Sequence, residues 1–334
     1  MFHAWTKRNQ PTADPIEPVD RQEPKAARLR IGLALGGGAA RGWAHIGVMR
    51  TLASAGIVPD VIAGTSMGAL VGGAWAAGRL EVLEEWARDI TRRRMLGLLD
   101  FRIGSSGLIA GSRLAQLLQR NLANVTIEEL DTRFAAIATE LGSGHEIWLT
   151  RGSLIDAIRA SYALPGIFSP VKVAGRWLMD GAMVNPIPVS AARALGARLV
   201  IAVNLHADVF GRGTVIQEHG DEPGSMPAET ETEAEEPGRF GNLLRFGRLL
   251  RRQVMGVKDG PQGIGSVMVD AFNITQDRIA RSRLAGDPPD VMIAPRLGQI
   301  GLFEFHRAEE TIRLGAEATE RALDELSEAV AALR

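Results

Sequence analysis

The 334-residue chain contains no cysteine. This absence excludes disulfide bonds, a thiolate nucleophile and any metal site built on cysteine, and it is typical of proteins in a reducing compartment. No stretch approaches the roughly 18 consecutive apolar residues of a membrane span, and residues 1–28 lack the apolar segment of a secretory signal peptide. These absences predict a cytoplasmic protein in which residues 1–28 form a flexible polar tail.

An excess of charge of either sign is also missing. The chain has 38 Lys plus Arg and 39 Asp plus Glu. Because no overall field attracts a polyanion, we expect no nucleic-acid partner. Apolar residues make up 46% of the chain, which is enough for the core of one large domain or two smaller ones.

Short apolar runs alternate with helical patterns along the chain. The helical patterns after the first two runs cover residues 39–55 and 67–77. The runs themselves, which we interpret as strands, are residues 29–35, 58–63, 134–138, 146–150, 177–179, 199–204 and 291–294. Strands that alternate with helices predict an α/β fold whose mainly parallel central sheet is covered by helices on both faces.

One region interrupts this alternation. Residues 218–236 are rich in acidic residues, glycine and proline, which predicts disorder. Residues 239–258 are basic and moderately amphipathic, and they form either a surface helix paired with its acidic neighbour, which we favour, or a helix that touches a membrane surface transiently. We therefore expect residues 207–259 to be an insert, a lid or a disordered loop, within a domain that spans residues 29–334.

The segment Gly64-Thr65-Ser66-Met67-Gly68 has the form Gly-x-Ser-x-Gly and lies between a predicted strand and a predicted helix. In a nucleophile elbow this pattern places the serine on a sharp turn with its hydroxyl exposed. Gly64 and Gly68 permit such a turn, and the N-terminal dipole of the following helix favours the developing negative charge. Chance matches are common in a chain with 38 glycines, so the motif alone does not decide the chemistry.

A second glycine-rich turn, residues 36–42, precedes this elbow by one helix. Its backbone N–H groups are candidate oxyanion donors, namely those of Gly36, Gly37, Gly38 and Ala39. Nucleotide binding fits the turn poorly. A Walker loop requires Gly-Lys-Ser/Thr where Arg41-Gly42-Trp43 stands, and a dinucleotide fingerprint requires glycine at the position of Arg41. Arg41 could anchor the turn, orient a phosphate-bearing substrate or form a structural ion pair.

The base that accepts the serine proton has two kinds of candidate. His206 and His306 follow Ser66 in the order found in α/β-hydrolase triads. Asp180 ends a short apolar run in the segment Asp180-Gly181-Ala182, although Asp-Gly is also a common turn dipeptide. The residues themselves leave both possibilities open.

Together these blocks resemble the patatin-like phospholipases. The glycine turn resembles the oxyanion block of that family, residues 64–68 resemble its elbow, and Asp180-Gly181-Ala182 resembles its Asp-Gly-Ala/Gly block. Further resemblances lie in segments that flank the catalytic aspartate of bacterial members and in segments of the bacterial RssA-type branch. The flanking segments are residues 160–170 and 185–189, and the branch segments are residues 35–48, 285–290 and 305–309. Gly36, Gly38 and Gly42 are spaced one residue wider than the usual family pattern.

The resemblance implies a three-layer α/β/α fold and a Ser-Asp dyad, in which Ser66 attacks an acyl carbonyl and Asp180 takes its proton. It implies no metal and no cofactor. The implied activity is that of a serine lipid acyl hydrolase or carboxylesterase, of phospholipase A or lysophospholipase type; the alternative is a regulatory or scaffolding protein on the same fold. A free aspartate, with a pKa near ~3.9, is a poor base, so burial must raise the pKa of Asp180. The residues that support the motifs are Arg41, Gly42, Gly64, Gly68, Gly181 and Ala182.

Overall fold

The computed structural model describes residues 29–91, 112–165, 167–208 and 264–333. The predicted tail, residues 1–28, lies outside these ranges. So does nearly all of the predicted insert, residues 207–259, including the basic segment 239–258. Within the insert only residues 207 and 208 are described, and both belong to a turn.

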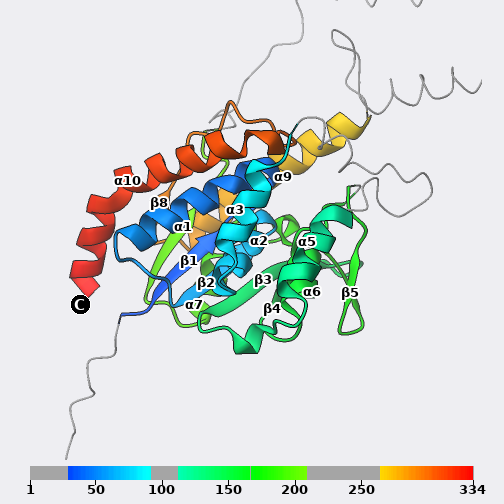
Figure 1. The fold of residues 1–334 in the computed structure, drawn as a ribbon, viewed down its shortest axis with the longest axis horizontal. Coiled ribbons are helices and arrows are strands. Elements are labelled where there is room, and N and C mark those ends of the chain that lie inside the picture. Colours follow the sequence, from blue (N-terminus) through cyan, green and yellow to red (C-terminus); the bar gives the residue numbers. More distant parts are fainter. Residues whose placement is uncertain (1–28, 92–111, 166, 209–263, 334) are drawn as a thin grey trace, which may run out of the picture.

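In the described part of the chain, an eight-stranded sheet forms the centre of the molecule (Figure 1). Its order is β5-β6-β3-β2-β1-β7-β8, with β4 paired to β3. The strands are β1 Ile31–Leu35, β2 Val61–Thr65, β3 Arg133–Glu140, β4 Glu146–Leu149, β5 Val171–Val173, β6 Arg176–Asp180, β7 Leu199–Val203 and β8 Val291–Ile293. Strands β3, β2, β1, β7 and β8 run parallel to their neighbours in this series, which confirms the predicted mainly parallel sheet.

The antiparallel part of the sheet contains the strand that the sequence did not predict. Strands β4 and β6 pair antiparallel with β3, and β5 pairs antiparallel with β6. Strand β5 is only three residues long, Val171-Lys172-Val173, which is too short to show a strand period. The predicted strand 58–63 lies later than expected, at β2, because Pro59 has no backbone N–H for a sheet and Asp60 instead accepts a bond from Ile31 N.

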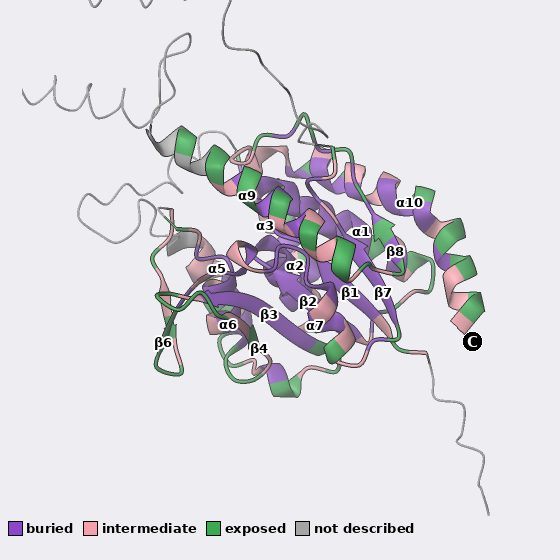
Figure 2. Cartoon of the chain, turned by 180° about the vertical axis from the view of Figure 1, so that it is seen from behind, coloured by how far each residue is buried: buried purple, intermediate pink, exposed green. Residues whose placement is uncertain are grey.

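Helices cover both faces of the sheet. Side chains of alternate strand residues point to opposite faces, so Leu33 and Leu35 of β1 join one core while Ala34 joins the other. The first face is covered by α1 Ala44–Ser54, α2 Met67–Ala76, α3 Leu80–Arg88, α5 Ser112–Leu122, α6 Leu154–Ser161 and α10 Ala308–Leu333. The second face carries α7 Val189–Ala194 and α9 Ile264–Gly286, which lie in front of the buried strands in Figure 2. The predicted three-layer α/β/α architecture is confirmed.

Short 3-10 segments connect several of these elements: η1 Ala39–Trp43, η2 Ile127–Glu129, η3 Gly181–Met183 and η4 Phe305–Arg307. The helix predicted over residues 39–55 therefore begins as η1 and continues as α1. Ala39 has a φ of 46°, in the left-handed region, which explains why the regular helix begins later.

Helices α1 and α10 approach each other closely through two glycines. A Cβ atom on Gly47 would lie 1.9 Å from the carbonyl oxygen of Ile312, and one on Gly315 would lie 2.1 Å from that of Ala44. Only glycine permits this backbone contact. The described helices include none that is both long and apolar enough to cross a membrane.

Candidate active site

Strand β3 brings Ser66 and Asp180 together. Strand β4 pairs with one edge of β3, up to Thr139. Strand β6 pairs with β3 at Ala138 and the next two residues. Because β4 already occupies the first edge there, β6 must lie on the opposite edge, which is also the edge that pairs with β2. On that edge Thr65 pairs with Ile137 and Asp180 pairs with Ala138. The end of β2 and the end of β6 therefore meet, although 114 residues separate Ser66 from Asp180.

Ser66 has the strained backbone of a nucleophile elbow. Its φ of 55° and ψ of −120° lie outside the usual regions, and it occupies the N-cap position of α2. The backbone N–H of Ser66 donates to Ser161 Oγ at 2.9 Å, and the Ser161 hydroxyl donates to the carbonyl oxygen of Ile137 at 2.6 Å. Gly68 allows α2 to start close to β1, because a Cβ there would lie 2.1 Å from the Leu35 oxygen. Gly64 is equally crowded, with a Cβ position 2.5 Å from Ala69 N.

The Ser66 hydroxyl donates to Asp180 Oδ2 at 2.7 Å. The other carboxylate oxygen, Oδ1, accepts the backbone N–H of Ala182 at 2.8 Å. Asp180 is only 2% exposed, and this burial raises its pKa to about 6, while the bonds from Ser66 and Ala182 lower it. The carboxylate is therefore a much better base than a free aspartate at neutral pH.

The backbone of Asp180 is fixed as firmly as its carboxylate. Its N–H donates to the carbonyl oxygen of Ala163 at 2.9 Å, and its own carbonyl oxygen accepts the Thr139 hydroxyl at 2.8 Å. Gly181 is required directly after it, since a Cβ at that position would lie 2.2 Å from the Ile137 oxygen. The Asp180-Gly181-Ala182 segment thus has a packing role in addition to the role of its carboxylate.

The glycine turn lies beside Ser66, but it offers fewer free donors than the sequence suggests. A Cβ at Gly37 would be 3.5 Å from Ser66 Cβ. However, Gly36 N donates to the Val203 oxygen at 3.2 Å, and Gly37 N donates to the Pro186 oxygen at 3.0 Å. Because both N–H groups already have acceptors, Gly36 and Gly37 are not free to act as the predicted oxyanion donors. The N–H groups of Gly38 and Ala39 have no acceptor among the described residues, and both residues line the cavity at Ser66.

Arg41 anchors the turn. Its Nε donates to the carbonyl oxygen of Ile300 at 2.9 Å, and the neighbouring Ala40 N donates to the Leu302 oxygen at 2.9 Å. Arg41 is 6% exposed, and burial lowers its pKa while Asp208 raises it. It is not among the residues that line the cavity at Ser66. Gly42 follows in η1, and a Cβ atom there would lie only 2.2 Å from Met67 Cβ. The absence of a side chain at Gly42 therefore lets the turn pack directly against the elbow.

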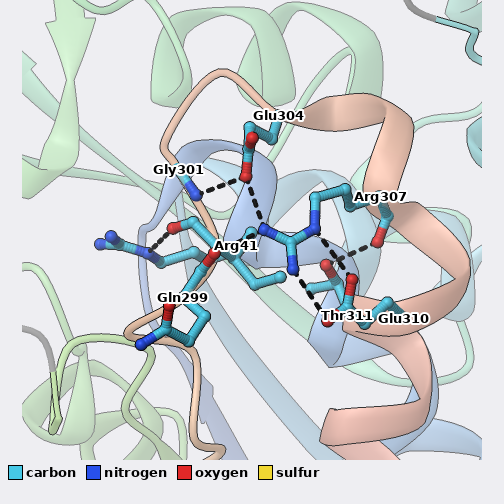
Figure 3. Close-up of polar contacts among 8 residues, drawn as sticks. Arg41, Gln299, Gly301, Glu304, Arg307, Glu310 and Thr311 are labelled. Carbon is cyan, nitrogen blue, oxygen red and sulfur yellow. Dashed lines mark hydrogen bonds and ion pairs between the residues drawn. The ribbon is translucent and has the colours of Figure 1, made fainter.

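The loop that receives Arg41 is itself held by Arg307 (Figure 3). Arg307 bonds to the carboxylates of Glu304 and Glu310 and to the carbonyl oxygen of Gln299. Glu304 also accepts the N–H of Gly301 at 2.9 Å. These contacts fix residues 299–307 against the glycine turn. Arg307 lies in segment 305–309, one of those with a family resemblance, but its supporting role was not predicted.

His45, which is fully buried in α1, is a supporting residue whose role was not predicted, although it lies in the resembling segment 35–48. Its Nε2 lies 2.7 Å from the carbonyl oxygen of Gly36. Burial lowers its pKa to about 4, so at neutral pH the ring is uncharged and donates Nε2–H to Gly36. His45 therefore fixes the first residue of the glycine turn.

The structure brings none of the described histidines to Ser66. Among the described residues the histidines are His45, His145, His206 and His306, and none hydrogen-bonds to Ser66 or lines its cavity. His206, a triad candidate from the sequence, lies near Arg41 and Asp277, and its pKa is lowered to about 4, mainly by burial. Asp180 is thus the base candidate that the geometry favours.

Ser66 and Asp180 open into a cavity of about 130 Å³ with a largely apolar wall. Its lining includes aromatic and aliphatic side chains from both the first core and the C-terminal half of the chain. Examples are Trp43, Leu70, Trp86, Tyr162, Phe168, Phe272, Phe303 and Phe305. In the described part of the chain, no three His, Asp or Glu side chains gather in a way that could hold a metal ion.

Comparison with known proteins gives consistent matches. The patatin-like phospholipase family profile matches residues 33–193. An uncharacterized NTE family protein of Mycobacterium bovis is 34% identical, with 88% of this chain and 91% of that protein covered, and one of Mycobacterium tuberculosis matches equally. Neuropathy target esterase sws of Drosophila melanogaster is 34% identical over 183 residues, which are 52% of this chain and 13% of that protein.

Proposed function

Because the chain belongs to the patatin-like phospholipase family, we propose that it is a serine hydrolase of lipid acyl esters that uses Ser66 and Asp180. The observation that carries this proposal is the 2.7 Å hydrogen bond from Ser66 Oγ to Asp180 Oδ2 in the lining of an apolar cavity. Family membership supports ester hydrolysis, and the names of relatives such as the fly neuropathy target esterase support an esterase in particular.

In the first half-reaction Ser66 Oγ attacks the acyl carbonyl carbon, and its proton moves to Asp180 Oδ2 along the existing hydrogen bond. The carbonyl oxygen becomes an oxyanion, which the N–H groups of Gly38 and Ala39 and the N-terminal dipole of α2 stabilise. Asp180 then protonates the leaving alcohol or lysolipid as the tetrahedral intermediate collapses. The product of this half-reaction is an acyl ester of Ser66.

The cavity favours a substrate with an apolar acyl chain. Side chains such as Leu70 and Phe305 offer no hydrogen bonds to a sugar or a peptide, whereas a hydrocarbon chain gains roughly 0.8 kcal/mol for each CH₂ that it buries. The substrates that fit this wall are phospholipids, lysophospholipids and neutral esters.

Covalent labelling tests the proposal directly. We expect a fluorophosphonate to modify Ser66, identified by peptide mass spectrometry, and we expect hydrolysis of p-nitrophenyl esters to disappear in Ser66→Ala. Ser143→Ala is the matched control, because Ser143 lies in an exposed turn and its partners among the described residues, Glu140 and His145, flank that turn. Equal hydrolysis by wild type and Ser66→Ala would refute the proposal.

A further inference from the structure

Gln276 of α9 is a buried polar residue that the dyad does not use. Its side chain is 4% exposed, and its Oε1 atom has no hydrogen-bond partner among the described residues. Gln276 lines the same cavity as Ser66 and Asp180. The position of a Cβ on Gly37 lies 3.8 Å from Gln276 Oε1 and 3.5 Å from Ser66 Cβ. The amide oxygen and the elbow therefore face one small region.

This position is costly for an amide that only fills space. Leaving a buried hydrogen-bonding atom without a partner destabilises the fold, because the atom has given up its hydrogen bonds to water. The wall includes side chains such as Leu70 and Phe272, which carry no donor. The buried indole N–H of Trp43 also lines the cavity but has no partner among the described residues, so it does not donate to Gln276. An acceptor in such a place indicates a donor that arrives during turnover.

The second half-reaction requires such a donor. A water molecule must enter the apolar cavity and give one proton to Asp180 as it attacks the acyl-serine. Its other O–H group then has no solvent to bond to, and without an acceptor the water is poorly oriented. Gln276 Oε1 is an unpartnered acceptor in this wall, beside the elbow.

We propose that Gln276 is the positioning residue for the hydrolytic water, a proposal that rests on the function proposed above. The water donates one O–H to Asp180 and the other to Gln276 Oε1. Its oxygen bonds to the acyl carbon as Asp180 takes the first proton, and the carbonyl electrons move to the oxygen held by Gly38 and Ala39. Collapse of this intermediate breaks the bond to Ser66 Oγ, which regains its proton from Asp180, and releases a carboxylic acid that keeps the second proton.

The test uses p-nitrophenyl butyrate to follow the two half-reactions separately. Its leaving group is p-nitrophenol, whose one hydroxyl is the group that cleavage of the ester creates. Gln276→Met keeps the length and volume of the side chain and removes the acceptor. We expect the variant to release about one p-nitrophenolate per Ser66 in a burst at the wild-type rate, followed by turnover at least about tenfold slower than wild type, since a lost bond of about 1.4 kcal/mol is a tenfold effect. Mass spectrometry of quenched samples should show butyryl-Ser66 in the variant.

Thr275→Val is the matched control on the exposed side of the same helix, where the hydroxyl bonds only to the Ala271 oxygen, and it should behave as wild type. If Gln276→Met slows the burst as much as turnover, or changes neither, the water-positioning role is wrong. Gln276→Leu repeats the measurement if the methionine variant does not fold. A wild-type protein with no turnover would instead contradict the proposed function, so the two failures are distinguishable.

Discussion

The hydroxyl of Ser161 accepts the backbone N–H of Ser66 at 2.9 Å and donates to the carbonyl oxygen of Ile137 at 2.6 Å. One side chain of α6 therefore ties the elbow to strand β3. Because Ser66 has a φ of 55°, a conformation unfavourable for a residue with a Cβ, this bond helps to offset the strain that the elbow requires.

We expect Ser161→Ala to lower the free energy of unfolding by about 1–3 kcal/mol, since two buried backbone groups lose their partner. Esterase activity should fall further than stability alone explains, because the elbow relaxes. Chemical denaturation and kcat measured on p-nitrophenyl esters test this, with Ser143→Ala as the exposed serine control. Unchanged unfolding energy in Ser161→Ala would show that the bond carries no stability.

The pH dependence of activity follows from the burial of Asp180. As a base it must be ionised, and its pKa is raised to about 6. We therefore expect kcat/KM to rise as the pH increases through about 6 and then to level off, as the pH profile of the free enzyme reports its essential base. A profile already flat at pH 5 would mean that Asp180 has an ordinary pKa.

The same raised pKa predicts an effect on stability with a definite sign. The folded protein binds the Asp180 proton more tightly than the unfolded chain, so the stability due to this proton is present at low pH and is lost as the pH rises from about 4 to about 6. Above that range the folded state contains a buried charge. We expect Asp180→Asn to be inactive yet more stable than wild type at pH 8, by up to about 3 kcal/mol, and no more stable at pH 4. Denaturant titrations at the two pH values measure the difference.

His45 provides a test of the glycine turn. In His45→Ala the carbonyl oxygen of Gly36 loses its donor and a cavity opens in α1, so we expect kcat to fall about tenfold or more while KM changes little, as expected if oxyanion donors shift. His45→Gln, which retains a side-chain N–H donor, should recover part of kcat. A defect in KM alone would assign His45 to substrate binding instead.

The sequence predicted the parts of the site that lie in local patterns. The elbow at Ser66 and the Asp180-Gly181-Ala182 segment are short motifs at the ends of apolar runs, and the parallel strands follow from those runs. Ser161 lies in one of the segments that resembled the patatin-like family, so its signal was available although its role was not.

Other features depend on contacts between distant segments, which no local pattern reports. The N–H groups of Gly36 and Gly37 are occupied by Val203 and Pro186, residues more than a hundred positions away. Gln276 follows a long segment outside the described residues, and only the position of α9 across the sheet places it at Ser66. The sequence therefore predicted the two residues of the proposed dyad, whereas the free N–H groups of the glycine turn and the supporting residues required the tertiary structure.

The role of Arg41 can be decided by comparing two substrates. If Arg41 anchors the glycine turn through the Ile300 oxygen, Arg41→Lys should weaken hydrolysis of a neutral p-nitrophenyl ester and of a lysophospholipid by the same factor, because both use the same oxyanion donors. If Arg41 orients a phosphate group, the loss should be confined to the phosphate-bearing substrate. We expect the equal loss, because Arg41 is buried and lies outside the cavity lining. The ratio of kcat/KM for the two substrates, measured in wild type and variant, gives the answer independently of how much of the variant is active.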